Sequence, residues 1–214
     1  MFICVAVIID VFRACTTAAY ILSHNPKIYI LANKSGTIER LISNFQNPLL
    51  VGKPEKGVNV AYHIPNSPTR TEEVMVSGRY VLHRTAAGAN GMMLAGSSDI
   101  LLAAGFMNAS ATARYIKNMK NVEVIIIPMG HEGIRPSLED NLCATYLKEL
   151  IGGKKPKIDT FIPILQKGAG KYFFSTDQYQ YPEADFFRCL EIDRFNFVIK
   201  ANVIEDYAIL TRIH

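Results

Sequence analysis

Charged residues are scarce in this chain, and they are dispersed. Of 214 residues, 20% are charged, and 23 Lys and Arg against 19 Asp and Glu give a net charge of +4. The sequence contains no Lys/Arg run and no basic stripe interleaved with aromatic residues, the patterns typical of nucleic-acid interfaces. We therefore expect no nucleic-acid partner, although the positive balance would suit a small anionic ligand.

Cysteine is also sparse. The chain has four cysteines, and none of them forms a C-x-x-C pair or shows the spacing of zinc ligands. They are Cys4, Cys15, Cys143 and Cys189. This scatter argues against a disulfide framework and a structural metal site, and it favours free thiols.

Long hydrophobic runs are missing as well. The opening stretch "MFICVAVII" is too short to span a bilayer, and it has neither a basic flank nor a small-residue cleavage site. We interpret it as a buried strand and not as a signal peptide. The expectation is a cytoplasmic protein without a membrane partner.

The common phosphate-binding and phosphatase motifs are absent. There is no G-x-G-x-x-G fingerprint, and "GKPEKG" (52–57) does not fit the G-x-x-x-x-G-K-[ST] loop. Asp10 is not followed by the second aspartate of a D-x-D motif, and no cysteine has an arginine six residues later. Phosphoryl chemistry in this chain would need a less common scaffold.

What is present is an alternation of short β-branched runs with stretches of helical period. The expected strands are 2–9, 27–32, 80–83, 99–105 and 122–130, and the expected helices are 14–23, 37–45, 108–119 and 137–151. This order predicts an α/β fold with three αβα layers and a mostly parallel or mixed sheet. The length suits a single domain over 1–214, with approximate halves 1–94 and 95–214.

Two segments of the chain resemble each other. "DVFRACTTAAYI" (10–21) and "GFMNASATARYI" (105–116) align without a gap, and each follows an apolar run. We infer a duplicated strand-turn-helix unit, with Arg13 and Asn108 at matching helix starts and two similar halves facing a shared cleft. The alternative is that any such unit with a small-residue helix start would look alike.

The first candidate site is "IIDVFRACTT" (8–17), where a carboxylate and a guanidinium follow an uncharged run. Ligands of open α/β sheets bind beyond the carboxyl ends of strands, near helix N-termini. We expect Asp10 to be ionised there and to hold a cation or attack an electrophile. Arg13 would offer its planar fork to phosphate or sulfonate oxygens. A helix cap with a surface salt bridge is the alternative.

A second candidate lies in "RPSLEDNLCATYLKEL" (135–150), which follows another apolar run. Ser137 and Asp140 form a pattern like a capping box, which puts Glu139 and Asp140 in the first helical turn. One explanation for acids at these positions is that they compensate the positive end of the helix dipole. Together with Asp10, they could instead complete an oxygen-ligand site for Mg²⁺.

Further polar groups lie near expected strand ends. Asn66 and Ser67 stand in the proline-flanked turn "PNSPTR", which could present side-chain donors or be a plain surface turn. Arg84 and Thr85 precede a glycine-containing helix start that could cradle an anion. His131 in "GHEG" could act as a general acid, although a structural role is the commoner one for a lone histidine.

Several motifs together resemble one family. They are "IDVFRACTT", "IPNSPTR", "HRTAAGANG", "GFMNASA", "SLEDNLCA" and "CLEIDRFNFVIK". In this order and at these separations they are similar to the 2-phosphosulfolactate phosphatases of the ComB type. The resemblance implies a three-layer α/β fold and Mg²⁺-dependent hydrolysis of 2-phospho-3-sulfolactate to 3-sulfolactate and phosphate, a step of coenzyme M biosynthesis. It also implies that the site comprises Asp10, Arg13, Asn66, Ser67, Arg84, Thr85, Gly88, Asn108, Glu139 and Asp140.

The chain departs from that family in places. Members usually have a further strand before the "IDVFRA" motif, so we expect either a different start or a missing edge element. Tyr62 and His63 replace the phenylalanine and aspartate that often precede the "NSP" turn. A phosphatase acting on another phosphorylated hydroxy acid and a non-catalytic anion-binding protein therefore stay as alternatives.

The resemblance leaves the mechanism open as well. Either a water molecule or Asp10 attacks phosphorus, and we favour Asp10, Glu139 and Asp140 around the metal. Arg13 and Arg84 would help to neutralise the anionic substrate. A homodimer is also left open as an expectation.

Overall fold

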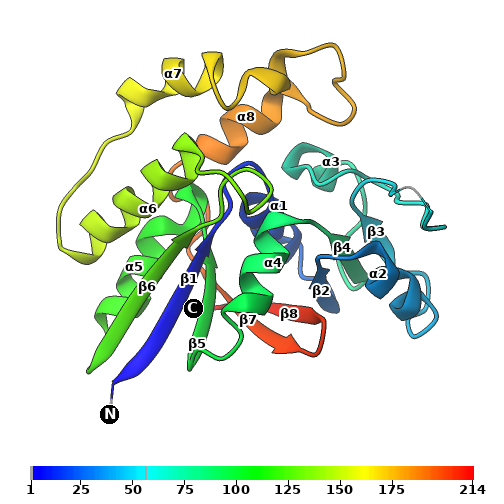
Figure 1. Ribbon diagram of the computed structural model, residues 1–214, viewed down its shortest axis with the longest axis horizontal. Coiled ribbons are helices and arrows are strands. Elements are labelled where there is room, and N and C mark those ends of the chain that lie inside the picture. Colours follow the sequence, from blue (N-terminus) through cyan, green and yellow to red (C-terminus); the bar gives the residue numbers. More distant parts are fainter. Residues whose placement is uncertain (1, 56) are drawn as a thin grey trace.

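The computed structural model describes residues 2–55 and 57–214. They form one eight-stranded mixed sheet in the order β3-β4-β2-β8-β7-β5-β1-β6, with helices on both faces (Figure 1). The strands are β1 (Ile3–Ile9), β2 (Ile28–Ala32), β3 (Leu49–Val51), β4 (Tyr80–Arg84), β5 (Ile100–Ala104), β6 (Val122–Pro128), β7 (Val198–Ile204) and β8 (Tyr207–Ile213). The three-layer α/β fold expected from the sequence is confirmed.

The helices follow the strands closely along the chain. The α-helices are α1 (Ala14–Ser23), α2 (Ser35–Ile42), α3 (Pro68–Glu72), α4 (Ala87–Leu94), α5 (Ala109–Lys117), α6 (Leu138–Ile151), α7 (Ile162–Lys167) and α8 (Glu183–Leu190). Short 3₁₀ turns span Phe106–Asn108, Asp159–Phe161 and Lys171–Phe174. The predicted elements lie where their apolar patterns put them, with boundaries shifted by a few residues.

Strand alternation distributes the core over both faces of the sheet. Ile8 and its neighbours on one face pack against α1 and α4. Val7 and its neighbours on the opposite face pack against α5, α6 and α8. On that same face, Ile30 of β2 packs against α2. Burying both faces explains why β1 reads as a continuous apolar run.

Three strands meet where the two similar segments lie. β1 is central and parallel to both β5 and β6, with Ile9 opposite Ala104 and Pro128. The carboxyl ends of these strands therefore lie side by side. Arg13 and Asn108, which correspond in the two similar segments, each precede a helix in nearly the same backbone conformation, with φ of −148° and −140°.

Two antiparallel strands complete the sheet and are missing from the strands predicted from the sequence. β7 and β8 form a hairpin that pairs with β5 on one side and with β2 on the other. Lys200, Asn202 and Thr211 along it are exposed, so the hairpin lacks the continuous apolar pattern of a fully buried strand.

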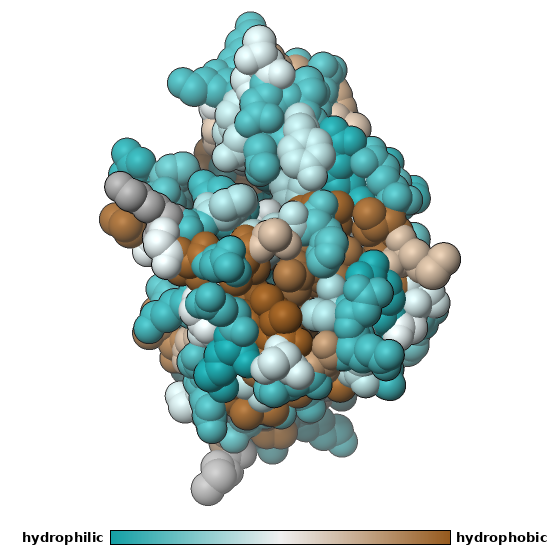
Figure 2. Space-filling model, turned by 90° about the vertical axis from the view of Figure 1, so that its right-hand side faces the viewer, coloured by the Kyte–Doolittle hydropathy of each residue, from teal (hydrophilic) through white to brown (hydrophobic). Residues whose placement is uncertain are grey.

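On the side nearest α2 and α3, polar side chains surround a central apolar patch (Figure 2). Since 49% of the residues are hydrophobic, most of them must lie inside, in the clusters described above. Within residues 2–55 and 57–214, no helix combines the length and apolar content needed to cross a membrane.

Candidate active site

Asp10 lies at the carboxyl end of β1, at the turn into α1. Its side chain is only 6% exposed. Oδ1 accepts a hydrogen bond from the Ala14 backbone N–H at 3.1 Å, and the Gly88 N–H at the start of α4 also donates to this carboxylate. The helix start and the neighbouring helix thus fix the carboxylate beyond the strand, as expected for a ligand site in an open α/β sheet.

Glu139 and Asp140 enter the same region from the first turn of α6. Asp140 is 2% exposed, and its two oxygens accept the backbone N–H groups of Val11 at 2.8 Å and Gly130 at 2.7 Å. The predicted capping box is therefore wrong, because Asp140 binds the loops that follow β1 and β6 instead. Ser137 still occupies the N-cap position, but its side chain makes no cap hydrogen bond.

Burial raises the pKa values of all three acids, and the charge of Asp140 adds to the effect on the other two. Burial and then the charge of Asp140 raise the pKa of Asp10 to about 7. Burial and then Asp140 likewise raise the pKa of Glu139 to about 7, and burial raises the pKa of Asp140. The sequence led us to expect an ionised Asp10 at a helix start. Its raised pKa makes ionisation less complete than expected, because desolvation outweighs the backbone donors.

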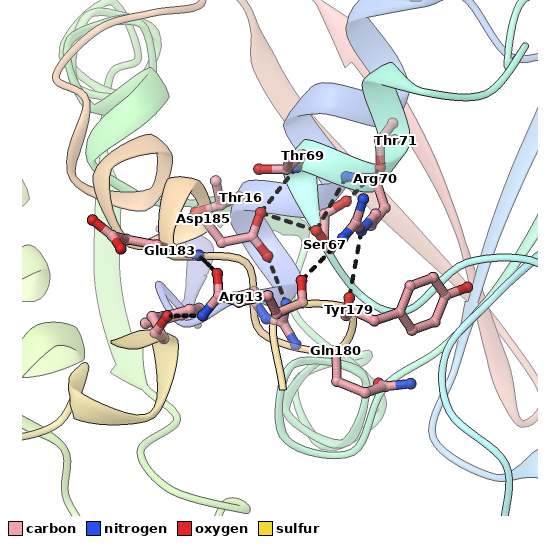
Figure 3. Close-up of polar contacts among 12 residues, drawn as sticks. Arg13, Thr16, Ser67, Thr69, Arg70, Thr71, Tyr179, Gln180, Glu183 and Asp185 are labelled. Carbon is pink, nitrogen blue, oxygen red and sulfur yellow. Dashed lines mark hydrogen bonds and ion pairs between the residues drawn. The ribbon is translucent and has the colours of Figure 1, made fainter. Parts of the chain in front are cut away.

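Arg13 is buried beside this cluster, but its ion pair is with a different acid. Nη1 donates to Asp185 Oδ2 at 2.6 Å, and the exposed fractions are 7% and 0% (Figure 3). The guanidinium carbon lies 5.0 Å from the ring centroid of Tyr181 and 5.6 Å from that of Phe173. The surface salt bridge considered from the sequence is thus a buried one, held between aromatic rings.

Arg84 approaches from the far part of the sheet, at the end of β4. Its partner is Glu55, with Nη2 and Oε2 separated by 3.4 Å, and Glu55 is 44% exposed. The Nε atom of Arg84 is buried and has no hydrogen-bond partner among residues 2–55 and 57–214. A long, solvent-exposed pair of this kind contributes little, so the Arg84 fork remains available to an anion.

One cavity of about 680 Å³ connects these groups. Of the site residues predicted from the sequence, those that line it are Asp10, Arg13, Asn66, Arg84, Thr85, Glu139 and Asp140. The expected convergence of groups from distant segments on a single polar pocket is therefore present for these residues.

Three predicted residues lie outside the cavity lining. Ser67 is fully buried, and its hydroxyl donates a hydrogen bond to Asp185. Gly88, in the first turn of α4, packs against Ala14 of α1. Asn108 is also fully buried; its amide accepts from the Gly105 N–H and lies 3.5 Å from the carbonyls of Ala103 and Phe197. None of the three lines the cavity, and their contact with substrate stays a prediction.

Some residues that line the cavity were not predicted from the sequence. Tyr172, Gln180 and Tyr181 reach it from the long connection before α8, and Lys53 reaches it from the loop after β3. The predicted His131 lies at the rim, in the hairpin that follows β6, together with Arg135. No motif in the sequence pointed to this connection, whose regular structure is limited to one short helix and 3₁₀ turns.

The acids do not by themselves form a finished metal site. Among the described residues, no group of three or more His, Cys, Asp and Glu side chains is arranged to hold a metal ion. One carboxylate oxygen, Glu139 Oε2, is nevertheless buried without a hydrogen-bond partner. The cluster thus has an oxygen donor with unused capacity, and among the described residues no cation lies within hydrogen-bond reach of that atom.

Comparisons with known proteins agree on one group. The model of the 2-phosphosulpholactate phosphatase family matches residues 2–202. A protein of Bacillus subtilis strain 168, named a probable 2-phosphosulfolactate phosphatase, is 28% identical over 199 residues, which cover 91% of this chain and 85% of that protein. One of the same name from Symbiobacterium thermophilum is 30% identical over 159 residues, covering 73% of this chain and 67% of that protein.

Substitution of Gly88 tests the close approach of α4 to Asp10. A Cβ there would lie 2.9 Å from Ala14 Cβ and 3.0 Å from Asp10 Oδ2. We expect Gly88→Ala to destabilise the protein by about 1–3 kcal/mol. Gly36→Ala is the matched control, because nothing lies within 4 Å of its Cβ position in α2. It should raise the melting temperature, and equal effects of the two substitutions in thermal melts would refute the packing argument.

The raised pKa values predict a pH-dependent stability. The folded-state pKa of Glu139 is about 7 against an ordinary 4.5. Between these values the folded state keeps a proton that the unfolded state has lost, so the stability contributed by Glu139 falls as pH rises and is fully lost above about pH 7. We therefore compare the melting temperatures of the parent and of Glu139→Gln, both in chelator, as the pH rises from 4.5 to about 7. The melting temperature of the parent should fall by several degrees relative to that of the variant, since about 1 kcal/mol shifts it by roughly 2–4 °C.

The control for this measurement is Glu123→Gln, which changes an exposed acid on β6. Its melting temperature should follow that of the parent at every pH. A parent-minus-Glu139→Gln difference that stays constant, or grows with pH, would contradict the buried-acid interpretation.

Proposed function

The chain belongs to the 2-phosphosulpholactate phosphatase family and is a phosphoric monoester hydrolase, and we propose that it hydrolyses 2-phospho-3-sulfolactate to 3-sulfolactate and phosphate. The observation that carries the proposal is the cavity in which Asp10, Glu139 and Asp140 meet Arg13 and Arg84. An ester that bears phosphate, carboxylate and sulfonate groups needs several cations around it. This reaction would serve coenzyme M biosynthesis.

The two arginines are suited to different parts of such a substrate. Arg13 lies beside the acid cluster, and we assign the phosphoryl oxygens to it. Arg84 enters from β4 and has only a long contact to Glu55, so we assign the sulfonate or carboxylate to it. A guanidinium binds two oxygens of one anion at once, which fixes orientation as well as charge.

We further propose that Asp10, Glu139 and Asp140 hold Mg²⁺. The donor chemistry fits, since Mg²⁺ prefers carboxylate oxygens and Glu139 Oε2 has no other partner. Proteins often bind Mg²⁺ through one or two carboxylates, with water and substrate phosphate as the other ligands, so a finished three-ligand cluster is not required. When bound, Mg²⁺ would neutralise charge on the phosphoryl group.

The side chains then act mainly by positioning. Hydrolysis forms a bond from a water oxygen to phosphorus and breaks the bond from phosphorus to the ester oxygen. The attacking water gives up one proton to the solvent, and the ester oxygen takes up one proton and leaves as a hydroxyl. Arg13 would hold the phosphoryl oxygens in line for this displacement. We assign delivery of the proton to His131 in its imidazolium form, which becomes neutral imidazole, because His131 lies at the cavity rim.

A panel of phosphate esters tests the function. Phosphate release should be fastest from 2-phospho-3-sulfolactate among phosphorylated hydroxy acids, should stop in chelator and should return with Mg²⁺. Asp10→Asn should reduce it by about 10³-fold or more. Asp99→Asn is the matched control, since Asp99 also accepts a backbone N–H, from Cys4, near the opposite ends of the same strands. Preference for another ester would reassign the substrate, and full activity of folded Asp10→Asn would refute the site.

Lysine substitutions test the arginine forks. Arg13→Lys and Arg84→Lys keep the charge but lose two-point binding, so each should lower kcat/KM by about tenfold or more. Arg188→Lys is the control for Arg13, because Arg188 also pairs with an acid, Glu72 at 2.6 Å, and lies over an aromatic ring, Tyr20. It lies outside the cavity lining and should leave kcat/KM unchanged. Parental kcat/KM in both site variants would make these arginines peripheral.

A further inference from the structure

Asp185, on α8, is a fully buried acid that the proposed reaction does not use. It is 0% exposed and is not among the described residues that line the cavity. Its carboxylate accepts hydrogen bonds from two other elements, the start of α1 and the start of α3 (Figure 3). A buried carboxylate with this many donors is tightly fixed.

The two carboxylate oxygens have separate partners. Oδ2 accepts from Arg13 Nη1 at 2.6 Å, while Oδ1 accepts from the Ser67 hydroxyl and the Thr69 N–H, both at 2.9 Å. Ser67 is the N-cap of α3 and directly follows Asn66, which lines the cavity. One side chain therefore sets the position of two cavity walls.

The bond to Asp185 also decides how Arg13 is oriented. It occupies Nη1, while the rings of Tyr181 and Phe173 lie near the guanidinium carbon. In the described part of the chain, Asp185 is the only acid within salt-bridge distance of Arg13. The donors on the other nitrogens are left for a ligand in the cavity that Arg13 lines.

Simple attachment of α8 to α3 does not need Asp185. These helices are also joined by Arg188 and Glu72, at 2.6 Å, on a more exposed surface. Orientation of Arg13 and attachment of α8 are therefore separable, and each can be tested by removing one carboxylate.

We propose that Asp185 is a positioning residue that aims the Arg13 guanidinium at the phosphoryl oxygens of the substrate and aligns the Asn66 turn with it. The proposal rests on the proposed function for the identity of the reacting ester. The role of Asp185 itself is the same for any phosphate ester, because a guanidinium held in this way would bind any phosphoryl group.

The test is a double-mutant cycle of Asp185→Asn and Arg13→Lys. Asp185→Asn keeps the shape but removes the charge and places an amide next to Arg13, so kcat/KM should fall by about 10- to 100-fold. In the Arg13→Lys background the same substitution should cost no more than about threefold, since both changes remove one interaction. Inhibition by inorganic phosphate should weaken in parallel. Glu72→Gln, which loosens α8 without touching Arg13, should leave both measurements at parental values.

Several results would overturn the proposal. They are parental kcat/KM in Asp185→Asn, multiplicative losses in the double variant, and an equal loss in Glu72→Gln. If Asp185→Asn does not fold, Asp185→Glu makes the same comparison, because the added methylene keeps the charge but displaces the carboxylate from its present position beside Arg13 Nη1. If the parent cleaves no ester, the proposed function fails; the cycle is then run on the Kd of inorganic phosphate, where an unchanged Kd in Asp185→Asn rejects the positioning role.

Discussion

The crowding of buried acids at the carboxyl end of β1 is the constraint on which the surrounding structure depends. Asp10, Glu139 and Asp140 are at most 7% exposed, and buried carboxylates are costly unless they accept hydrogen bonds. The donors are backbone N–H groups of the connections after β1 and β6 and of the start of α4. The backbone of the loops around the site thus supplies most of the hydrogen bonds that these buried acids accept.

The same constraint explains why Arg13, the buried arginine beside these acids, forms its ion pair with Asp185 and not with a member of the cluster. An Arg13 paired directly with Asp10 would neutralise the cluster from within and leave neither group for a ligand. Asp185 instead accepts Arg13 from the side of α8, which lies above the carboxyl end of β1 (Figure 1). The acid cluster and the cation thus remain separate neighbours, each with unused capacity toward the cavity.

Much of this arrangement could be predicted, because fully buried parallel strands give continuous apolar runs and their carboxyl ends meet at one edge. Asp10 and Asp140 were found in this way. The hairpin of β7 and β8 was not, since one of its faces is partly solvated and its turn, Glu205 and Asp206, lacks the usual glycine even though Glu205 has φ of 54°. Asp185 was not found either, because a single acid on a helix gives no sign of a partner 172 residues away.

That hairpin has a consequence for the order of assembly. It alone joins the strands β3, β4 and β2 to the strands β5, β1 and β6 within the sheet. Arg84 belongs to the first group, whereas Asp10 belongs to the second. The two groups can therefore join into one sheet only when residues 198–213 are in place, and each group without the hairpin would leave two strand edges unpaired. The cavity, whose walls come from both groups, thus depends on a hairpin that contributes none of its described lining residues.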